Sequence, residues 1–187
     1  MSKSKPVGLT DDVDKDDTVR VLGIDPGLNI TGYAVIDVTR GQVSLVEAGV
    51  VRSKPKQSLA KRIASIFNGV SELITELKPD TMGLEELYSH YERPKTSIIM
   101  GHARGVICLA AELNQVEIKS YAATQVKKII TGNGRASKTQ VQLAVTRQLN
   151  LPEPPEPVDV SDAMAIAMCH YYLGLSGNPL LGRSCYF

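Results

Sequence analysis

Three strand-like segments in immediate succession constrain the fold of this chain more than any other feature. The first, residues 19–24, is short and mostly apolar and ends at an Asp-Pro-Gly turn signal. Two more follow at residues 30–38 and 43–51, joined by a hairpin turn over residues 39–42. Strands joined by so short a connection pair in antiparallel fashion. We therefore predict three consecutive antiparallel strands.

The next part of the chain alternates helices with strands. Apolar residues recur at helical spacing over residues 58–77, and a Lys-Pro-Asp sequence ends that helix. Residues 81–84 then read as a fourth strand, which ends in two glutamates. A return to the sheet after a helix indicates a parallel crossover. A helix over residues 95–114 and a fifth strand over residues 116–121 repeat the pattern.

The remaining segments complete an α/β domain. Further helices are predicted at residues 123–131, 137–149 and 160–173. We therefore predict a five-stranded mixed sheet, three antiparallel strands followed by two parallel ones, flanked by helices and spanning residues 19–173. Residues 1–18 are acidic and lack apolar periodicity, which predicts a disordered extension, and residues 174–187 are interpreted as a C-terminal tail.

Composition argues against several classes of protein. The three cysteines show no CxxC spacing and no cluster with histidine, so a zinc site is not expected. No apolar run approaches the ~20 residues that cross a bilayer, so we expect no membrane contact. The first residues lack the apolar region of a signal peptide. These features predict a cytoplasmic protein.

Positive charge is concentrated in one segment. The formal net charge is only +1, but residues 122–148 contain basic residues and no acid: Lys127, Lys128, Arg135, Lys138 and Arg147. Within this segment a glycine-rich loop, residues 131–138, leads into a helix. We expect free backbone amides at that helix start, with Arg135 and Lys138, to bind a phosphate. The alternative is an ordinary helix–helix loop with solvated charges.

Acidic residues stand at the edges of three apolar elements. Asp25 follows the first strand, Glu85 and Glu86 end the fourth, and Asp159 and Asp162 share one face at the start of the last helix. Each group alone has an ordinary explanation: a turn aspartate, a solvated strand end or a helix cap. Together they offer the carboxylates that Mg²⁺ or Mn²⁺ prefers. The pattern does not choose between the two glutamates.

The motifs resemble the RuvC family of bacterial Holliday junction resolvases over about residues 19–171. They are LGIDPGLNITGYAVI, GLEELY, GHARGV, YAATQVKKIITGNGRASKTQV and DVSDAMAIAMCH, in that order. The resemblance implies a ribonuclease H-like fold. It also implies a metal-dependent endonuclease of recombination and repair, which resolves four-way DNA junctions by paired symmetric nicks that leave 5′-phosphate ends.

The resemblance also implies roles for individual residues. It selects Glu85 over Glu86 and gives the metal ligands as Asp25, Glu85, Asp159 and Asp162, of which the Asp159 position is the more variable in the family. Lys138 and Lys127 match basic residues linked to catalysis and DNA binding. Tyr88 stands where the family usually has phenylalanine at the junction centre. We add as DNA-binding candidates, from their charge, Arg93, Lys95, Lys128 and Arg135.

The expected cofactor is two Mg²⁺ ions per subunit, with Mn²⁺ as a substitute. Paired cuts in a symmetric junction predict a C2 homodimer, with the Gly- and Ala-rich helix at residues 95–114 as its contact surface. The resemblance adds the RuvA–RuvB branch-migration complex as a partner. Two alternatives stay open: a ribonuclease H-like nuclease that cuts RNA/DNA hybrids, and a junction-binding protein without catalysis.

Overall fold

A computed structural model describes residues 18–87 and 94–175 of the chain. In this part the strands are β1 (Thr18–Asp25), β2 (Ile30–Thr39), β3 (Gln42–Arg52), β4 (Thr81–Glu85) and β5 (Glu117–Tyr121). The helices are α1 (Leu59–Leu77), α2 (Pro94–Leu113), α3 (Ala123–Thr131), α4 (Lys138–Gln148) and α5 (Val158–His170), and a short π-helical segment, η2 (Tyr171–Leu175), continues α5.

The strands form one mixed sheet in the order β3-β2-β1-β4-β5. β1 pairs antiparallel with β2, and β2 antiparallel with β3, as the short connections predicted. β4 pairs parallel with β1, and β5 parallel with β4, because the chain crosses over through α1 and then α2. The predicted five-stranded topology is therefore confirmed, and β1 begins at Thr18, one residue earlier than expected.

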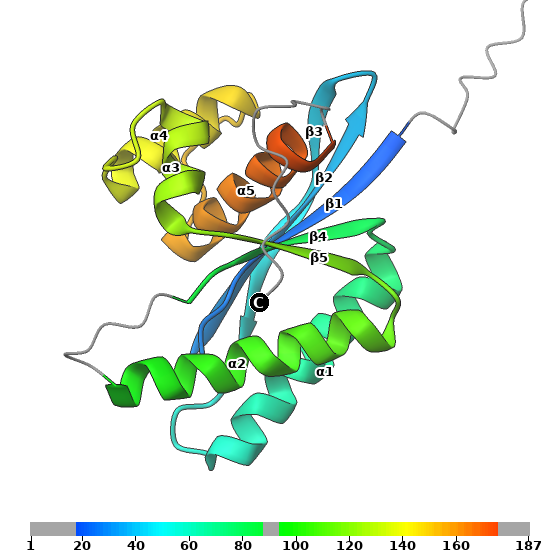
Figure 1. Ribbon diagram of the computed structural model, residues 1–187, viewed down its shortest axis with the longest axis vertical. Coiled ribbons are helices and arrows are strands. Elements are labelled where there is room, and N and C mark those ends of the chain that lie inside the picture. Colours follow the sequence, from blue (N-terminus) through cyan, green and yellow to red (C-terminus); the bar gives the residue numbers. More distant parts are fainter. Residues whose placement is uncertain (1–17, 88–93, 176–187) are drawn as a thin grey trace, which may run out of the picture.

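Helices cover both faces of the sheet (Figure 1). α1 and α2 lie on one face and bury a cluster that includes Leu22, Met82 and Ile107. α3, α4 and α5 lie on the other face, where a second cluster includes Val21, Val145 and Met168. The central strands β1, β2 and β4 are thus buried on both sides, which accounts for the nearly continuous apolar runs in β1 and β4.

α5 lies directly on the sheet because three neighbouring strands each carry a glycine beneath it. A Cβ atom on Gly23 of β1 would lie 2.3 Å from the carbonyl oxygen of Ala163 in α5. A Cβ on Gly32 of β2 would lie 2.1 Å from the carbonyl oxygen of Asp159, and Gly83 of β4 packs against the same helix. Any side chain at these positions would lift α5 away from the strands.

The last residue of α5, His170, is a fully buried core residue. Its Nε2 lies 2.8 Å from the hydroxyl of Thr81, and its Nδ1 lies 2.7 Å from the hydroxyl of Tyr121. The Thr81 hydroxyl donates to the carbonyl of Glu117 at 3.3 Å, so it accepts from Nε2–H, while Tyr121 donates to Nδ1. Burial lowers the pKa of His170 to about 4, with a smaller contribution from the charge of Lys119.

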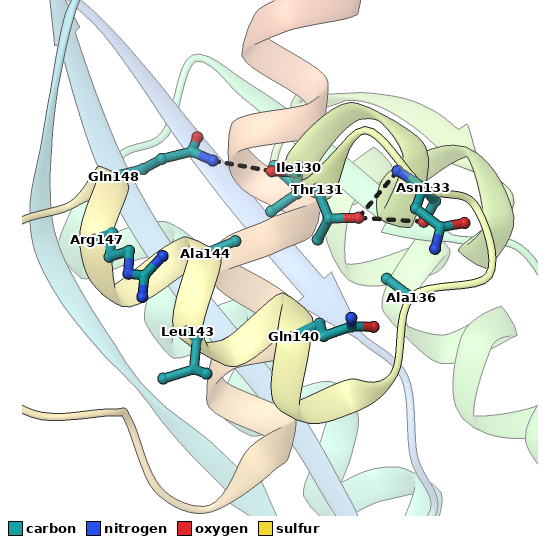
Figure 2. A pocket seen from close by; sticks show the side chains of 9 residues that line it. All are labelled: Ile130, Thr131, Asn133, Ala136, Gln140, Leu143, Ala144, Arg147 and Gln148. Atoms are coloured by element: carbon teal, nitrogen blue, oxygen red, sulfur yellow. Dashed lines mark hydrogen bonds between the residues drawn. The ribbon is translucent and has the colours of Figure 1, made fainter.

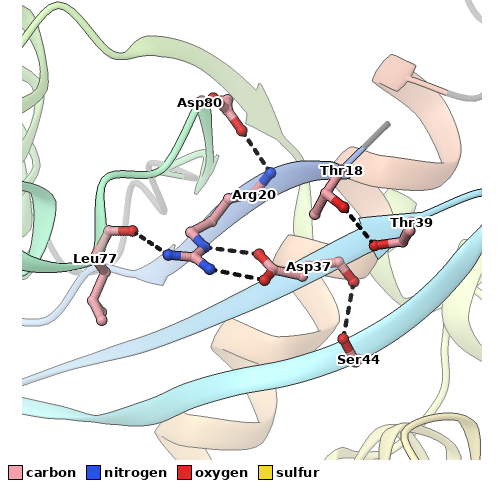
Figure 3. A network of polar contacts seen from close by, with 7 residues as sticks. All are labelled: Thr18, Arg20, Asp37, Thr39, Ser44, Leu77 and Asp80. Carbon is pink, nitrogen blue, oxygen red and sulfur yellow. Dashed lines mark hydrogen bonds and ion pairs between the residues drawn. The ribbon is translucent and has the colours of Figure 1, made fainter. Parts of the chain in front are cut away.

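A network of hydrogen bonds around Arg20 joins β1, β2 and the α1–β4 turn at one end of the sheet (Figure 3). The guanidinium of Arg20 donates to both carboxylate oxygens of Asp37 at 2.7 and 2.8 Å and to the carbonyl of Leu77 at 2.8 Å. The backbone amide of Arg20 donates to Asp80 at 2.7 Å. A bidentate pair of this kind fixes geometry as well as adding free energy. This end lies opposite the one where β1 and β4 finish.

The expectation that no stretch would be apolar enough to span a membrane needs correction. Residues Thr96–Leu113 of α2 meet that test by length and composition alone, and 22% of this stretch is buried. One side of α2 packs through Ala103, Ile107 and Ala110 into the buried cluster that the helix shares with α1 and the sheet. The other side of α2 exposes large apolar side chains.

Candidate active site

The C-terminal ends of β1 and β4 bring two acids together. The strands are parallel neighbours with Ile24 opposite Leu84, so the next residue of each, Asp25 and Glu85, leave the sheet side by side. A side-chain hydrogen bond joins their carboxyl groups. The adjacent Glu86 is exposed and is not among the groups that shift the pKa of Asp25 or of Glu85. Of the two glutamates, Glu85 is therefore the one that lies beside Asp25.

Burial and repulsion dominate the electrostatics of this pair. Burial, then the charge of Glu85 and the hydrogen bond that Asp25 donates to it, raise the pKa of Asp25 from 3.8 to about 9. Burial is also the main cause that raises the pKa of Glu85, opposed by its hydrogen bond from Asp25. The charge of Asp162 raises both pKa values, and that of Lys138 lowers both. The pair thus holds a proton at neutral pH when no cation is bound.

Asp162 comes to the same place from α5. Its carboxylate accepts a hydrogen bond from Nζ of Lys138 at 2.8 Å, and its side chain is 19% exposed against 67% for Lys138. That bond, with the charges of Asp162, Asp25 and Asp159, raises the pKa of Lys138 against the opposing effect of burial. The charge of Lys127 from α3 lowers the pKa of Glu85. Two lysines therefore balance an excess of carboxylates.

Asp159 lies at the edge of the acidic group. It is in the first turn of α5, one turn before Asp162, as the spacing predicted. Its charge acts on Lys138, but it is absent from the interactions that shift Asp25 and Glu85. The structure thus brings together Asp25, Glu85 and Asp162 and leaves Asp159 beside Lys138.

The acids fit a divalent cation in chemistry, although their spacing is not that of a formed site. Among residues 18–87 and 94–175, no three acidic, histidine or cysteine side chains are close enough to hold a metal ion as they stand. Yet the repulsion that forces a proton onto Asp25 and Glu85 is what a bound cation would relieve, and an all-oxygen donor set suits hard ions.

The expectation of free amides at the start of α4 stays a prediction. Some amides of the loop are bound within it: the amide of Asn133 donates to Thr131, and that of Arg135 donates to Asn133. Ser137 and Gln140 form a reciprocal capping box at the start of α4. Arg135 is exposed on this loop and offers a side chain for a phosphate contact as well.

A pocket of about 450 Å³ lies between α3 and α4 (Figure 2) and contains none of the acids. Its lining is mainly apolar, with Arg147 and Gln148 at the α4 side, and Gln148 donates to the carbonyl of Ile130 at 3.0 Å. The candidate site is instead the open edge where β1 and β4 end. Tyr88 and Arg93 lie outside the described residues, as does the side chain of Lys95, and Lys128 is exposed on α3.

Sequence reasoning missed Arg104 of α2. Its Nε donates to the backbone carbonyl of Glu85 at 3.2 Å, and its terminal nitrogen donates to the Ser120 hydroxyl of β5 at 2.6 Å. Arg104 therefore holds the last peptide of β4 against β5, next to the acidic pair. It occurs in the motif GHARGV, but its partners are distant in sequence, so spacing carried no signal for this contact.

Comparison with known proteins defines the class as a nuclease of the ribonuclease H-like fold. The family model described as "Crossover junction endodeoxyribonuclease RuvC" matches residues 21–170. A curated relative from Rhodopirellula baltica with that description is 54% identical over 160 residues, covering 86% of this chain and 89% of its own. One from Alkaliphilus metalliredigens is 38% identical over 154 residues, covering 82% and 93%. The chain belongs to the RuvC family.

Solved structures agree with this assignment. Thermus thermophilus RuvC has a TM-score of 0.75 at 31% identity, covering 82% of this chain and 94% of its own. The same protein in complex with a Holliday junction substrate gives 0.76 at 30% identity, covering 82% and 93%. The yeast mitochondrial Holliday junction resolvase, at 14% identity and a TM-score of 0.60, shares the fold. The ribonuclease H-like expectation is thereby confirmed.

Proposed function

We propose that this protein is an endonuclease that resolves four-way (Holliday) DNA junctions by paired nicks in recombination and repair. The observation that carries the proposal is the convergence of Asp25, Glu85 and Asp162, from three separate elements, at one edge of the sheet in a chain of this family. We propose 5′-phosphate products, a cytoplasmic location and the RuvA–RuvB branch-migration complex as a partner.

We propose that the carboxylates bind Mg²⁺, two ions per subunit, with Mn²⁺ able to substitute. Asp25, Glu85 and Asp162 would hold the ions, with Asp159 at the periphery. Such ions lower the pKa of bound water and neutralise charge on the scissile phosphodiester. The acids contribute by surrendering the proton that Asp25 and Glu85 share, because a carboxyl must be ionised to act as a ligand.

Lys138 is the residue best placed to act on the DNA itself. It is 67% exposed, remains protonated beside Asp162, and lies close enough to Asp25 for their charges to interact. A phosphate at this edge would lie beside a fixed positive charge. That charge would stabilise the negative charge that develops on the phosphate in the transition state. We therefore assign Lys138 a role in catalysis and Lys127, Lys128 and Arg135 roles in binding the DNA backbone.

The exposed side of α2 supports the proposed homodimer. Large apolar side chains on this helix are uncovered: Ile98 is 61%, Ile99 40%, Leu109 49% and Leu113 64% exposed. On the same helix a Cβ on Gly101 or Gly105 would meet nothing within 4 Å, so another helix can approach closely there. An isologous contact through this face would give two equivalent active sites, which two symmetric cuts require.

The α2 contact is tested by the mass of the protein in solution. We expect the wild-type chain to sediment as a dimer and the Leu109→Glu variant as a monomer, because a charge would be buried in the contact. Leu143→Glu is the matched control, since Leu143 is a similarly exposed leucine on α4, and it should remain dimeric. Dimerisation of Leu109→Glu equal to wild type would rule out this surface.

The activity is tested with a synthetic mobile four-way junction and Mg²⁺, with and without a chelator. We expect paired nicks, no cleavage of an RNA/DNA hybrid, and no cleavage in the chelator. Asp25→Asn should bind the junction and not nick it; nicking by this variant would refute the metal-site assignment. Lys138→Ala should slow or stall cleavage and stay folded. Junction binding without any cleavage would favour the non-catalytic alternative.

A further inference from the structure

A second basic surface, not anticipated from the sequence, lies at the junction of β3 and α1. Its members are exposed cations within a 10-residue stretch: Arg52, Lys54, Lys56 and Lys61. We call this group the β3–α1 basic surface. No acidic residue occurs between Glu47 and Glu72, so nothing within this stretch neutralises it. Such a local charge attracts a phosphate backbone even though the whole chain is nearly neutral.

The sheet register places this surface at the end of the sheet that carries the acids. Asp25 of β1 pairs with Gly32 near the start of β2, and Ile30 of β2 pairs with Arg52 at the end of β3. The end of β3 therefore lies at the same end of the sheet as Asp25. Figure 1 shows the β3–α1 connection on the α1 and α2 side of the sheet, with α3 and α4 on the other side.

A side-chain network fixes this connection to the turn that follows Asp25. Arg62 of α1 donates to the side chain of Asn29 and, at 3.2 Å, to the hydroxyl of Ser53. Ser53 is buried, donates its hydroxyl to the carbonyl of Leu28, and donates its amide to the carbonyl of Asn29 at 3.1 Å. The β3–α1 basic surface thus has a set position relative to the acids.

The charged residues of α1 are placed in the order opposite to the one that the helix dipole favours. The dipole favours acids in the first turn and bases in the last. α1 has no acid in its first turn and no base in its last turn; Lys61 and Arg62 stand near its start, and Glu72 and Glu76 near its end. These charges do not serve helix stability. Their order instead makes the end of α1 nearest the acids positive.

We propose that the β3–α1 basic surface binds backbone phosphates of a duplex arm of the DNA substrate, on the side of the acids opposite α3 and α4. The inference rests on the proposed function. A duplex presents one phosphate charge about every 1.7 Å along its axis, so basic groups on both sides of the acidic edge would contact phosphates flanking the cut. The carboxylates would otherwise repel DNA from this edge.

The test compares two double variants that remove the same charge. Lys54→Gln/Lys56→Gln removes two cations of the surface. Arg40→Asn/Lys78→Asn removes two at the opposite end of the sheet, where both residues have positive φ angles of 51° and 48° that asparagine tolerates. Binding of an intact junction is measured over a salt series in a chelator, and single-turnover nicking at saturating protein in Mg²⁺.

We expect Lys54→Gln/Lys56→Gln to bind more weakly and to reduce the slope of log K against log salt by about 1.8, or about 0.9 for each lost contact. Its nicking rate at saturating protein should stay within about twofold of wild type. The control Arg40→Asn/Lys78→Asn should keep the affinity, the salt slope and the nicking rate of wild type within about twofold. If wild type binds the junction and Lys54→Gln/Lys56→Gln shows the same salt slope as wild type, this inference alone is overturned. Failure of wild type to bind any junction overturns the proposed function and this inference with it.

Discussion

Replacing Asp25 by asparagine should make the metal-free protein more stable while abolishing nicking. In the absence of a cation, burial and the charge of Glu85 raise the pKa of Asp25 to about 9 from 3.8. Asparagine has the same shape and also donates a hydrogen bond to Glu85, but it needs no proton to do so. The variant therefore removes the cost of protonating a carboxyl group when the chain folds.

The magnitude of this effect follows from linkage. A group whose folded pKa is raised stabilises the protein fully below its unfolded pKa, and that contribution is lost as the pH rises towards the folded value. At about pH 7.5, the gap from 3.8 corresponds to about 5 kcal/mol at about 1.4 kcal/mol per pKa unit. Water that enters the open edge relaxes the repulsion, so we expect a measured gain of about 1–3 kcal/mol.

The assay is denaturant unfolding of wild type and Asp25→Asn in a chelator between about pH 5 and pH 8.5. The stability of wild type relative to the variant should fall as the pH rises, because only wild type takes up the proton. Added Mg²⁺ should raise the melting temperature of wild type more than that of Asp25→Asn, since bound ligand stabilises the folded state. A variant less stable than wild type throughout this range would refute the electrostatic reasoning.

Three further predictions concern the supports of the site. Wild type should lose about 2 kcal/mol of stability between pH 7.5 and pH 5, because His170 has a pKa of about 4 in the folded protein but accepts a proton below about pH 6.5 in the unfolded chain. The His170→Gln variant should not show this loss. An equal loss of stability in both proteins over this pH range would contradict the prediction. Gly23→Ala should cost about 1–3 kcal/mol in denaturant unfolding, because its Cβ meets the Ala163 carbonyl of α5 at 2.3 Å; full stability would show that α5 can lift freely. Arg104→Ala should slow nicking and raise the Mg²⁺ concentration for half-maximal rate, with junction affinity kept, because it frees the Glu85 carbonyl; an unchanged Mg²⁺ response would exclude a positioning role.

Much of the fold could be predicted because it depends on local pattern. The hairpin between β2 and β3 and the helical spacing of α1 are both written in consecutive residues, and both are confirmed. The acids at strand ends were visible for the same reason. That Glu85, and not Glu86, would lie beside Asp25 was not visible, because it depends on which side of the sheet each side chain faces; only the resemblance to a family pointed to Glu85.

Contacts between distant segments account for what the sequence did not reveal. Several amides of the α3–α4 loop looked free, but the side chain of Asn133 and the capping box at Ser137 satisfy those of Arg135, Ser137 and Gln140. The β3–α1 basic surface was overlooked because its charges straddle a strand end and a helix start, and because only the register of β3 places Arg52 at the same end of the sheet as Asp25.

The acidic site depends on packing that lies outside it. Asp25 and Glu85 are fixed to each other by the pairing of β1 with β4, whereas Asp162 reaches them only if α5 lies flat on the sheet. That contact needs bare backbone at Gly23, Gly32 and Gly83. The repulsion among the carboxylates opposes this arrangement, so the buried core beneath α5 must supply the opposing free energy. A change that raises α5 should therefore separate Asp162 from a pair that stays intact.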